Sequence, residues 1–159
     1  MNKNQITKDK ICAFYASDYH FEMISLPYIE KNIEENKKVI ILTENNLENT
    51  IKVLLNKMNL EDKKRNNIEK INWKQNDLEK FKEIKKEIEK QKELIIFVKG
   101  KNNYIKNINS NIDKWIENKE RVKVIDCYDI EEISDKMSDI MESYNLILST
   151  SGEKEIDKI

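Results

Sequence analysis

Residues Lys10–Asp18 read Lys-Ile-Cys-Ala-Phe-Tyr-Ala-Ser-Asp, a short apolar run that ends in small and polar residues. The run is too short for a helix of its own and is rich in Ile, Phe and Tyr, which predicts a β-strand over residues 10–16. Ser17 and Asp18 offer N-cap side chains to an amphipathic pattern that follows at once. A strand that passes directly into a helix is typical of a βαβ unit, so these residues predict an α/β fold.

The alternation of strand and helix patterns continues along the chain. Apolar runs predict further strands at 39–44, 68–73, 93–98 and 121–129, and an edge strand at 146–148. Apolar residues at three- and four-residue steps predict helices at 19–35, 47–58, 77–88, 102–118 and 133–141. We therefore predict an α/β fold with a mainly parallel sheet of about six strands and helices on both faces.

Length and composition fit one domain over residues 1–159, with residues 1–9 and 151–159 as frayed ends and 59–67 as a charged connection. The 29 Lys and Arg residues nearly balance the 30 Asp and Glu residues, which argues against direct nucleic-acid binding. No apolar run approaches the ~20 residues that cross a bilayer, and the first ten residues lack the apolar segment of a signal peptide. We expect a cytoplasmic protein without membrane contact.

Cysteine and histidine are scarce. Cys12 and Cys127 each lie in an apolar, strand-like run, which favours two reduced core thiols over a disulfide. The single His20 and the absence of close Cys and His pairs remove the usual zinc spacings, so we predict no metal site.

Glycine is also scarce. The chain has only Gly100 and Gly152, and neither lies in a phosphate-binding or dinucleotide-binding motif. The segment Val98-Lys99-Gly100-Lys101 follows a predicted strand and precedes a predicted helix. It is typical of a turn with exposed lysines, and a phosphate site there is the less favoured alternative.

Polar residues gather where predicted strands end. In open α/β sheets ligands bind at the carboxyl ends of the strands, so we examine these ends for a site. Acidic residues there could hold Mg²⁺, but helix capping is the favoured role of Asp18 and Asp129. Nucleophilic catalysis has little support, and we predict no catalytic residue and no cofactor. The predicted ligand-binding residues are Tyr15, Ser17, Asp18, Glu44, Tyr128 and Asp129.

Segments near both ends of the chain resemble one family of sensory domains. The opening consists of residues 10–15, a helix from Phe21 to Ile29 through Pro27-Tyr28, and the run 38–42. Near the end come Val124–Asp129 with a Cys-x-Tyr-Asp pattern, Ile140-Met141 and Leu146–Leu148. These segments are similar to those of the MEDS domain, the sensory domain of the dichloromethane repressor and of methanogen and methylotroph signalling proteins.

The resemblance implies a degenerate relative of RecA-type ATPases that has lost the phosphate loop and serves as a ligand sensor. Such domains occur alone or joined to DNA-binding or histidine-kinase modules. The chain departs from the family at Lys10, where the family often has His, and at Tyr144-Asn145, where it often has His-Pro. Asn32 and Asn36 replace glycines common in the first turn from helix to strand.

Three functional hypotheses follow. The leading one is a stand-alone, non-catalytic sensory or regulatory domain that binds a small molecule or a regulatory protein such as a kinase or transcription factor. The second is a residual nucleotide-binding enzyme, in which Asp126 or Asp129 holds Mg²⁺ and Lys99 or Lys101 meets phosphate. The third is a pure protein-interaction module. A homodimer could form through an edge strand at 68–73 or 146–148.

Overall fold

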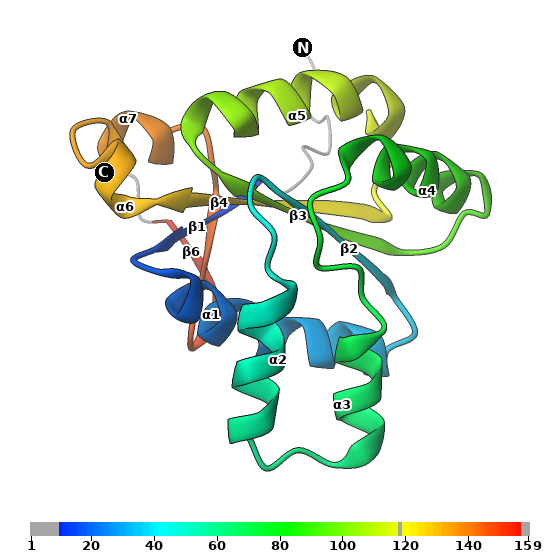
Figure 1. Cartoon of the computed structure of the whole chain (residues 1–159). Coiled ribbons are helices and arrows are strands. Elements are labelled where there is room, and N and C mark those ends of the chain that lie inside the picture. Colours follow the sequence, from blue (N-terminus) through cyan, green and yellow to red (C-terminus); the bar gives the residue numbers. More distant parts are fainter. Residues whose placement is uncertain (1–9, 118, 157–159) are drawn as a thin grey trace.

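A computed structural model describes residues 10–117 and 119–156. It has an α/β fold, with a central sheet between two layers of helices (Figure 1). In chain order the elements are β1 (Ile11–Tyr15), α1 (Asp18–Glu34), β2 (Lys38–Thr43), α2 (Glu48–Lys57), α3 (Asp62–Glu69), α4 (Asp77–Glu89), β3 (Leu94–Gly100), α5 (Asn102–Ile116), β4 (Val122–Asp129), α6 (Ile130–Ile133), α7 (Met137–Met141), β5 (Leu146–Ser149) and β6 (Gly152–Glu155).

The sheet has six strands in the order β2-β3-β4-β1-β5-β6. The first five strands in this order run parallel to one another, and β6 pairs antiparallel with β5. β1 therefore lies inside the sheet, and its carboxyl end lies beside that of β4. The prediction of a mainly parallel sheet of about six strands with helices on both faces is confirmed.

Alternating side chains of the strands build one core on each face of the sheet. Ile11, Ala13 and Tyr15 of β1 join the core under α1, α2 and α3. Cys12 and Phe14 join the core under α4, α5 and the α6–α7 segment. Every residue of β1 is buried on one face or the other, which explains why its sequence is a continuous apolar run. We call the two faces the α1 side and the α5 side.

The turn between α1 and β2 is closed by an asparagine. Asn36 has φ of 65°, in the left-handed region that glycine usually occupies and that asparagine tolerates. The amide of Asn36 donates to the carbonyl of Ile33, and the amide of Lys37 donates to that of Asn32. This pair of bonds is a Schellman motif, so asparagine ends the helix here without glycine.

The predicted strand at 68–73 is wrong, and so is the charged connection at 59–67. Residues Asp62–Glu69 form α3, whose last turn contains the buried Ile68. Trp73 follows in an irregular segment, where its indole donates to the carbonyl of Ile68 at 2.9 Å and its own carbonyl accepts from the amide of Leu47. The apolar residues of this segment therefore fill the α1-side core without pairing in the sheet.

The C-terminal part also differs from the prediction. The helix expected at 133–141 is two short helices, α6 and α7. Within the tail predicted to fray from residue 151, residues Gly152–Glu155 form β6, while residues 1–9 and 157–159 lie outside the described part. Because β6 covers β5, the segment 146–148 is not an edge, and neither of the predicted dimer edges exists.

The two cysteines lie in neighbouring strands but on opposite faces. Cys12 belongs to the α5-side core and Cys127 to the α1-side core, and both are buried. No disulfide joins them, as predicted. In the part of the chain that the structure describes, none of the helices combines the length and apolar character that crossing a membrane requires.

Candidate functional site

The six predicted ligand-binding residues do not converge on one site. The parallel register pairs Tyr15 with Asp129 and Phe14 with Tyr128 at the ends of β1 and β4. Since successive side chains alternate between faces, Tyr15 lies in the α1-side core and Tyr128 in the α5-side core. The site predicted at the strand ends is therefore divided by the sheet itself.

Three of the six residues serve local structure. The Ser17 hydroxyl accepts from the amide of His20 at 3.1 Å and caps α1. The carboxylate of Asp129 accepts from the amide of Glu131 at 3.0 Å and caps α6. Glu44 accepts from the amide of Lys101 at 2.8 Å, at the N-terminus of α5.

Gly100 allows this close approach of Glu44. A Cβ atom at Gly100 would lie 2.7 Å from the Glu44 Oε1 atom and 2.7 Å from the Tyr104 ring. The glycine therefore makes room for a carboxylate, which explains a glycine at the end of β3 without a phosphate ligand.

Lys99 is buried at the end of β3, so the prediction of an exposed turn is wrong for this lysine. Its ammonium lies 2.9 Å from Asp18 Oδ1 and 3.0 Å from Asn45 Oδ1. It also lies 4.6 Å from the centre of the Tyr15 ring and 5.4 Å from that of Phe21. Burial and nearby carboxylates such as Asp129 raise the pKa of Tyr15, so this ring stays neutral. The cluster is complete without a ligand.

Five carboxylate and ammonium side chains are buried within the described residues, and they differ in their partners. Lys99 has Asp18, and Glu87 lies 3.5 Å from the ammonium of Lys90. Lys80 donates to the carbonyl of Lys74. Burial lowers the pKa of Lys80 to about 8.

The other two buried groups, Asp126 and Glu22, are carboxyl groups without an ion-pair partner among the described residues. Each of them lines a cavity.

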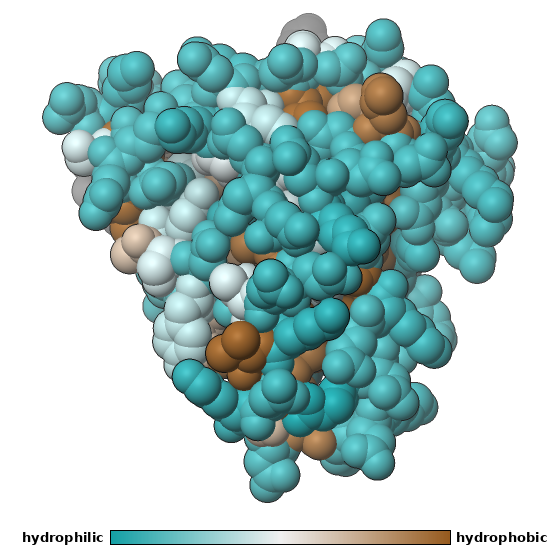
Figure 2. Space-filling view, viewed as in Figure 1, coloured by the Kyte–Doolittle hydropathy of each residue, from teal (hydrophilic) through white to brown (hydrophobic). Residues whose placement is uncertain are grey.

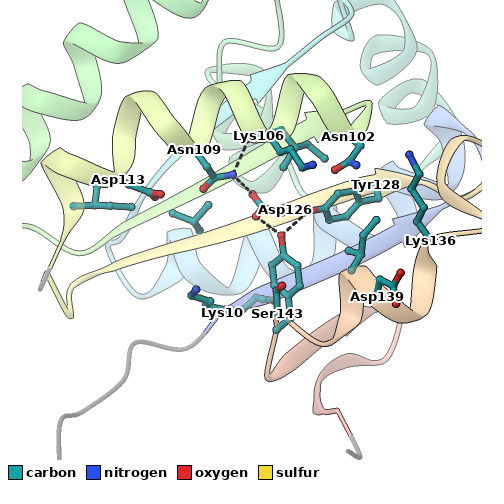
Figure 3. A pocket seen from close by; sticks show the side chains of 16 residues that line it. Lys10, Asn102, Lys106, Asn109, Asp113, Asp126, Tyr128, Lys136, Asp139 and Ser143 are labelled. Carbon is teal, nitrogen blue, oxygen red and sulfur yellow. Dashed lines mark hydrogen bonds between the residues drawn. The ribbon is translucent and has the colours of Figure 1, made fainter. Parts of the chain in front are cut away.

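The larger of these cavities lies on the α5 side, between α5 and the segment that contains α7. Its volume is about 520 Å³. Figure 3 shows Asp126 at its centre, with Lys106 and Asn109 of α5 on one side and Lys136 and Asp139 on the other. We call it the Asp126 cavity. Of the predicted ligand-binding residues, Tyr128 lines it.

A chain of hydrogen bonds holds the Asp126 carboxylate. Asn109 donates to Oδ1 at 3.0 Å and also to the carbonyl of Ile105, which fixes its amide. The Tyr144 hydroxyl donates to Oδ2 at 2.6 Å. Because Tyr144 has a single hydroxyl proton, the 2.6 Å contact between the hydroxyls of Tyr128 and Tyr144 has Tyr128 as its donor. The hydroxyl oxygen of Tyr128 keeps its capacity to accept a hydrogen bond.

The environment of Asp126 makes its charge costly. Burial raises the pKa of Asp126 to about 6, and the hydrogen bonds from Tyr144 and Asn109 only partly oppose the rise. Burial also raises the pKa of Tyr144, as does the nearby Asp126 carboxylate, so Tyr144 remains a hydrogen-bond donor. A carboxyl group with a perturbed pKa in a cleft is a physical sign of a functional site.

The walls of the Asp126 cavity combine apolar and charged groups. Isoleucine side chains such as Ile105 and Ile140 supply apolar surface, and Lys10, Lys106 and Lys136 supply ammonium groups. Such a lining suits a small organic molecule with an apolar body and polar groups that fix its orientation. Lys10 and Tyr144 both line the cavity.

Sequence reasoning considered Asp126 only as a magnesium ligand at a strand end. The structure places it inside β4, opposite Val98 and Cys12 in the flanking strands. A charged residue inside a strand that is buried on both faces is unusual, and this signal was present in the sequence. The roles of Asn109 and Tyr144 had no such signal, because their contacts with Asp126 span 17 and 18 residues.

Two residues of the enzyme hypothesis, Lys99 and Asp126, lie on opposite faces of the sheet. Lys99 lies among residues of the α1-side core, whereas Asp126 faces the α5-side cavity. Within residues 10–117 and 119–156, no group of three or more His, Cys, Asp or Glu side chains is placed to hold a metal ion.

The chain was compared with family models, with curated proteins and with solved structures, and none of them matches it.

Proposed function

We propose that the chain is a non-catalytic sensory or regulatory domain that binds a small organic molecule in the Asp126 cavity. One observation carries the proposal: the buried Asp126 carboxylate lies in a cavity of about 520 Å³ and, among the residues that the structure describes, accepts hydrogen bonds from the neutral side chains of Asn109 and Tyr144. The volume falls within the range of roughly 300–1,000 Å³ that is usual for small-molecule sites.

The ligand class follows from the lining. Apolar side chains would contact the body of the molecule, and a hydrogen-bond donor or cation on it would meet the Asp126 carboxylate or the Tyr128 hydroxyl. An anionic group would lie toward Lys10, Lys106 or Lys136.

The resemblance to MEDS domains supports the same proposal. It implies a RecA-type sheet without a phosphate loop, and the parallel strands in the order β2-β3-β4-β1-β5 agree with that implication. The two positions at which the chain departs from the family histidines, Lys10 and Tyr144, contribute to one cavity. A sensor of this kind passes its signal to another protein, such as a kinase or a transcription factor.

A thermal-shift screen tests the proposal. The purified chain is heated with common metabolites, with one-carbon compounds and with nucleotides plus Mg²⁺. A ligand that binds only the native state stabilises it by about 2.7 kcal/mol at a hundredfold excess over its Kd. This raises the Tm of a domain of this size by several degrees.

Two variants decide whether a hit occupies the Asp126 cavity. Asp126→Asn removes the carboxylate that faces the ligand, so we expect the shift in Tm to fall by more than half. Glu44→Gln is the matched control, because this residue contacts the start of α5 outside the cavity, and we expect the shift to remain. A metabolite whose shift survives in Asp126→Asn would contradict the proposed site. If no compound in the screen raises the Tm, the hypothesis of a protein-interaction module would be favoured.

A further inference from the structure

A second cavity lies on the other face of the sheet, between α1 and α2. Its volume is about 270 Å³, and its lining includes Tyr19 and Glu22 of α1 and Thr50, Val53 and Leu54 of α2. Tyr19 is 60% exposed and Val53 is 54% exposed, so large apolar side chains remain in contact with solvent there. Figure 2 shows a brown apolar patch over α2 on an otherwise largely hydrophilic face. We call this the Glu22 cavity.

Glu22 is a polar residue in this largely apolar lining, and one of its carboxylate oxygens lacks a hydrogen-bond partner among the described residues. The residue is only 1% exposed, and its Oε2 atom is buried and has no hydrogen-bond partner among the described residues. Thr50 lies close enough to lower the pKa of the carboxyl group, but its hydroxyl donates to the carbonyl of Leu47 at 3.0 Å. Lys99 lies near enough to act on Glu22, but its ammonium is already bound to Asp18 at 2.9 Å.

An orphaned carboxylate oxygen is costly in a buried site. Burial raises the pKa of Glu22, and the nearby Asp18 adds to this effect. A bound group that donates hydrogen bonds and carries positive charge would offset the cost by satisfying Oε2. The rest of the lining offers mainly apolar contact, which fits a ligand with one cationic end and an apolar body.

We propose that the Glu22 cavity binds a small molecule that carries a primary ammonium group on a short apolar chain. The ammonium would donate to the unpartnered Oε2 of Glu22, and the chain would lie against Val53, Leu54 and Tyr19. The volume suits a single small molecule. Lys57 also lines the cavity but is exposed, so its own charge is hydrated. This site lies on the opposite face from the Asp126 cavity and does not depend on the function proposed above.

The test is a titration of the intact chain followed by amide chemical shifts in NMR. The probe is n-pentylammonium chloride, and the matched probes are n-pentanol and sodium pentanoate at the same ionic strength. We expect the ammonium probe to shift the amides of Thr50, Val53 and Leu54 at millimolar concentration. It should bind at least tenfold more tightly than the alcohol, because a charge-assisted hydrogen bond replaces a neutral one. The anionic probe should not bind.

Two variants on α1 sharpen the test. Glu22→Gln keeps the side-chain volume and removes the charge, so we expect about tenfold weaker binding of pentylammonium and unchanged binding of pentanol. Glu30→Gln is the control, because Glu30 also has a buried oxygen atom without a hydrogen-bond partner but does not line the cavity. Its affinity for pentylammonium should match that of the wild type.

Equal affinities of Glu22→Gln and the wild type for pentylammonium would overturn the proposal. So would the absence of shifts at Thr50, Val53 and Leu54 with 50 mM pentylammonium. The comparison of the three probes uses only the wild-type chain, so it decides the question even where a variant fails to fold.

Discussion

Lys99 and Asp126 are buried charged residues in adjacent strands, and they differ in what surrounds them. The Lys99 ammonium has an opposite charge at 2.9 Å, an amide oxygen at 3.0 Å and an aromatic ring at 4.6 Å. The Asp126 carboxylate has two neutral donors and a cavity of about 520 Å³ beside it. A buried charge is tolerated when it is paired and hydrogen-bonded, and only Lys99 meets both conditions.

The difference assigns a different role to each face of the sheet. The cluster around Lys99 joins β1, β3 and the start of α1, so it holds the strand ends together on the α1 side. On the α5 side the charge compensation is incomplete, and empty volume remains next to the charge. Self-contained bonding is typical of a structural cluster, whereas incomplete bonding beside a cavity is typical of a ligand site.

The largest expected effect comes from Asp18→Ala. The substitution leaves the ammonium of Lys99, whose side chain is 3% exposed, without its counter-ion. Removing one partner of a buried pair typically costs about 3–5 kcal/mol, and we expect a loss in this range in the free energy of unfolding. Urea denaturation at pH 7 measures it.

Lys99→Met is the matched control for this prediction. The Asp18 side chain is 35% exposed, so water solvates its carboxylate once the lysine is gone. We expect this variant, and the double variant Asp18→Ala/Lys99→Met, to lose about 1 kcal/mol or less. A loss with Lys99→Met as large as with Asp18→Ala would contradict the view that the buried cation is the group that needs compensation.

The second prediction concerns pH and Asp126. The pKa of Asp126 is about 6 in the native state against an ordinary value of 3.8, so the native state binds this proton more readily than the unfolded state. Protonation therefore stabilises the fold, and stability decreases as the pH rises from about 4 to about 6. One pKa unit corresponds to about 1.4 kcal/mol, so the loss reaches about 3 kcal/mol above pH 6.

Asp126→Asn removes this titration. The difference in unfolding free energy between wild type and variant should change by about 2.5 kcal/mol between pH 4 and pH 7 in favour of the variant, as measured by urea denaturation. Asp139→Asn is the control, because Asp139 lines the same cavity but is exposed. A difference that stays constant over this pH range would show that Asp126 has an ordinary pKa.

The sequence predicted the elements that local pattern determines. The residues of β1 and the long apolar runs of β2, β3 and β4 are buried throughout or nearly so, and each was recognised as a strand. β6 could not be recognised, because residues Gly152–Glu155 are mostly exposed and polar and pair through their backbone with β5. At 68–73 the prediction of a strand was wrong, because the apolar residues there belong to the end of α3 and to the loop that follows it.

The sites were harder to predict because they depend on contacts between distant residues. Lys99 reads as part of an exposed turn until the fold brings Asp18 and Asn45 to its ammonium. Asp126 was visible as an acid inside an apolar run, but its donors Asn109 and Tyr144 come from α5 and the segment before β5. Residue type and spacing identified the residues at the strand ends. Because side chains alternate between the two faces of the sheet, these residues do not form one site.

The third prediction concerns Tyr144→Phe. The variant removes the donor to Asp126 Oδ2 and leaves the carboxylate with the bond from Asn109. A hydrogen bond to a charged group contributes about 2 kcal/mol, so we expect a loss of this size in unfolding free energy at pH 7. Because the bond from Tyr144 lowers the pKa of Asp126, its loss should raise that pKa further, which NMR titration of the carboxyl carbon would measure. An unchanged pKa would contradict the assigned bond.

The smallest effect is expected from Tyr128→Phe. The Tyr128 hydroxyl donates to Tyr144 and has no direct bond to Asp126, so the variant removes one neutral hydrogen bond. We expect a loss of about 1 kcal/mol at pH 7 and little change in the pKa of Asp126. In the double variant with Tyr144→Phe, the Tyr128 hydroxyl has already lost its acceptor. The second substitution should then cost less than it does alone, and this coupling in a double-mutant cycle measures the bond between the two hydroxyls. Additive losses would mean that the two tyrosines act separately, and that the chain of hydrogen bonds does not extend beyond Tyr144.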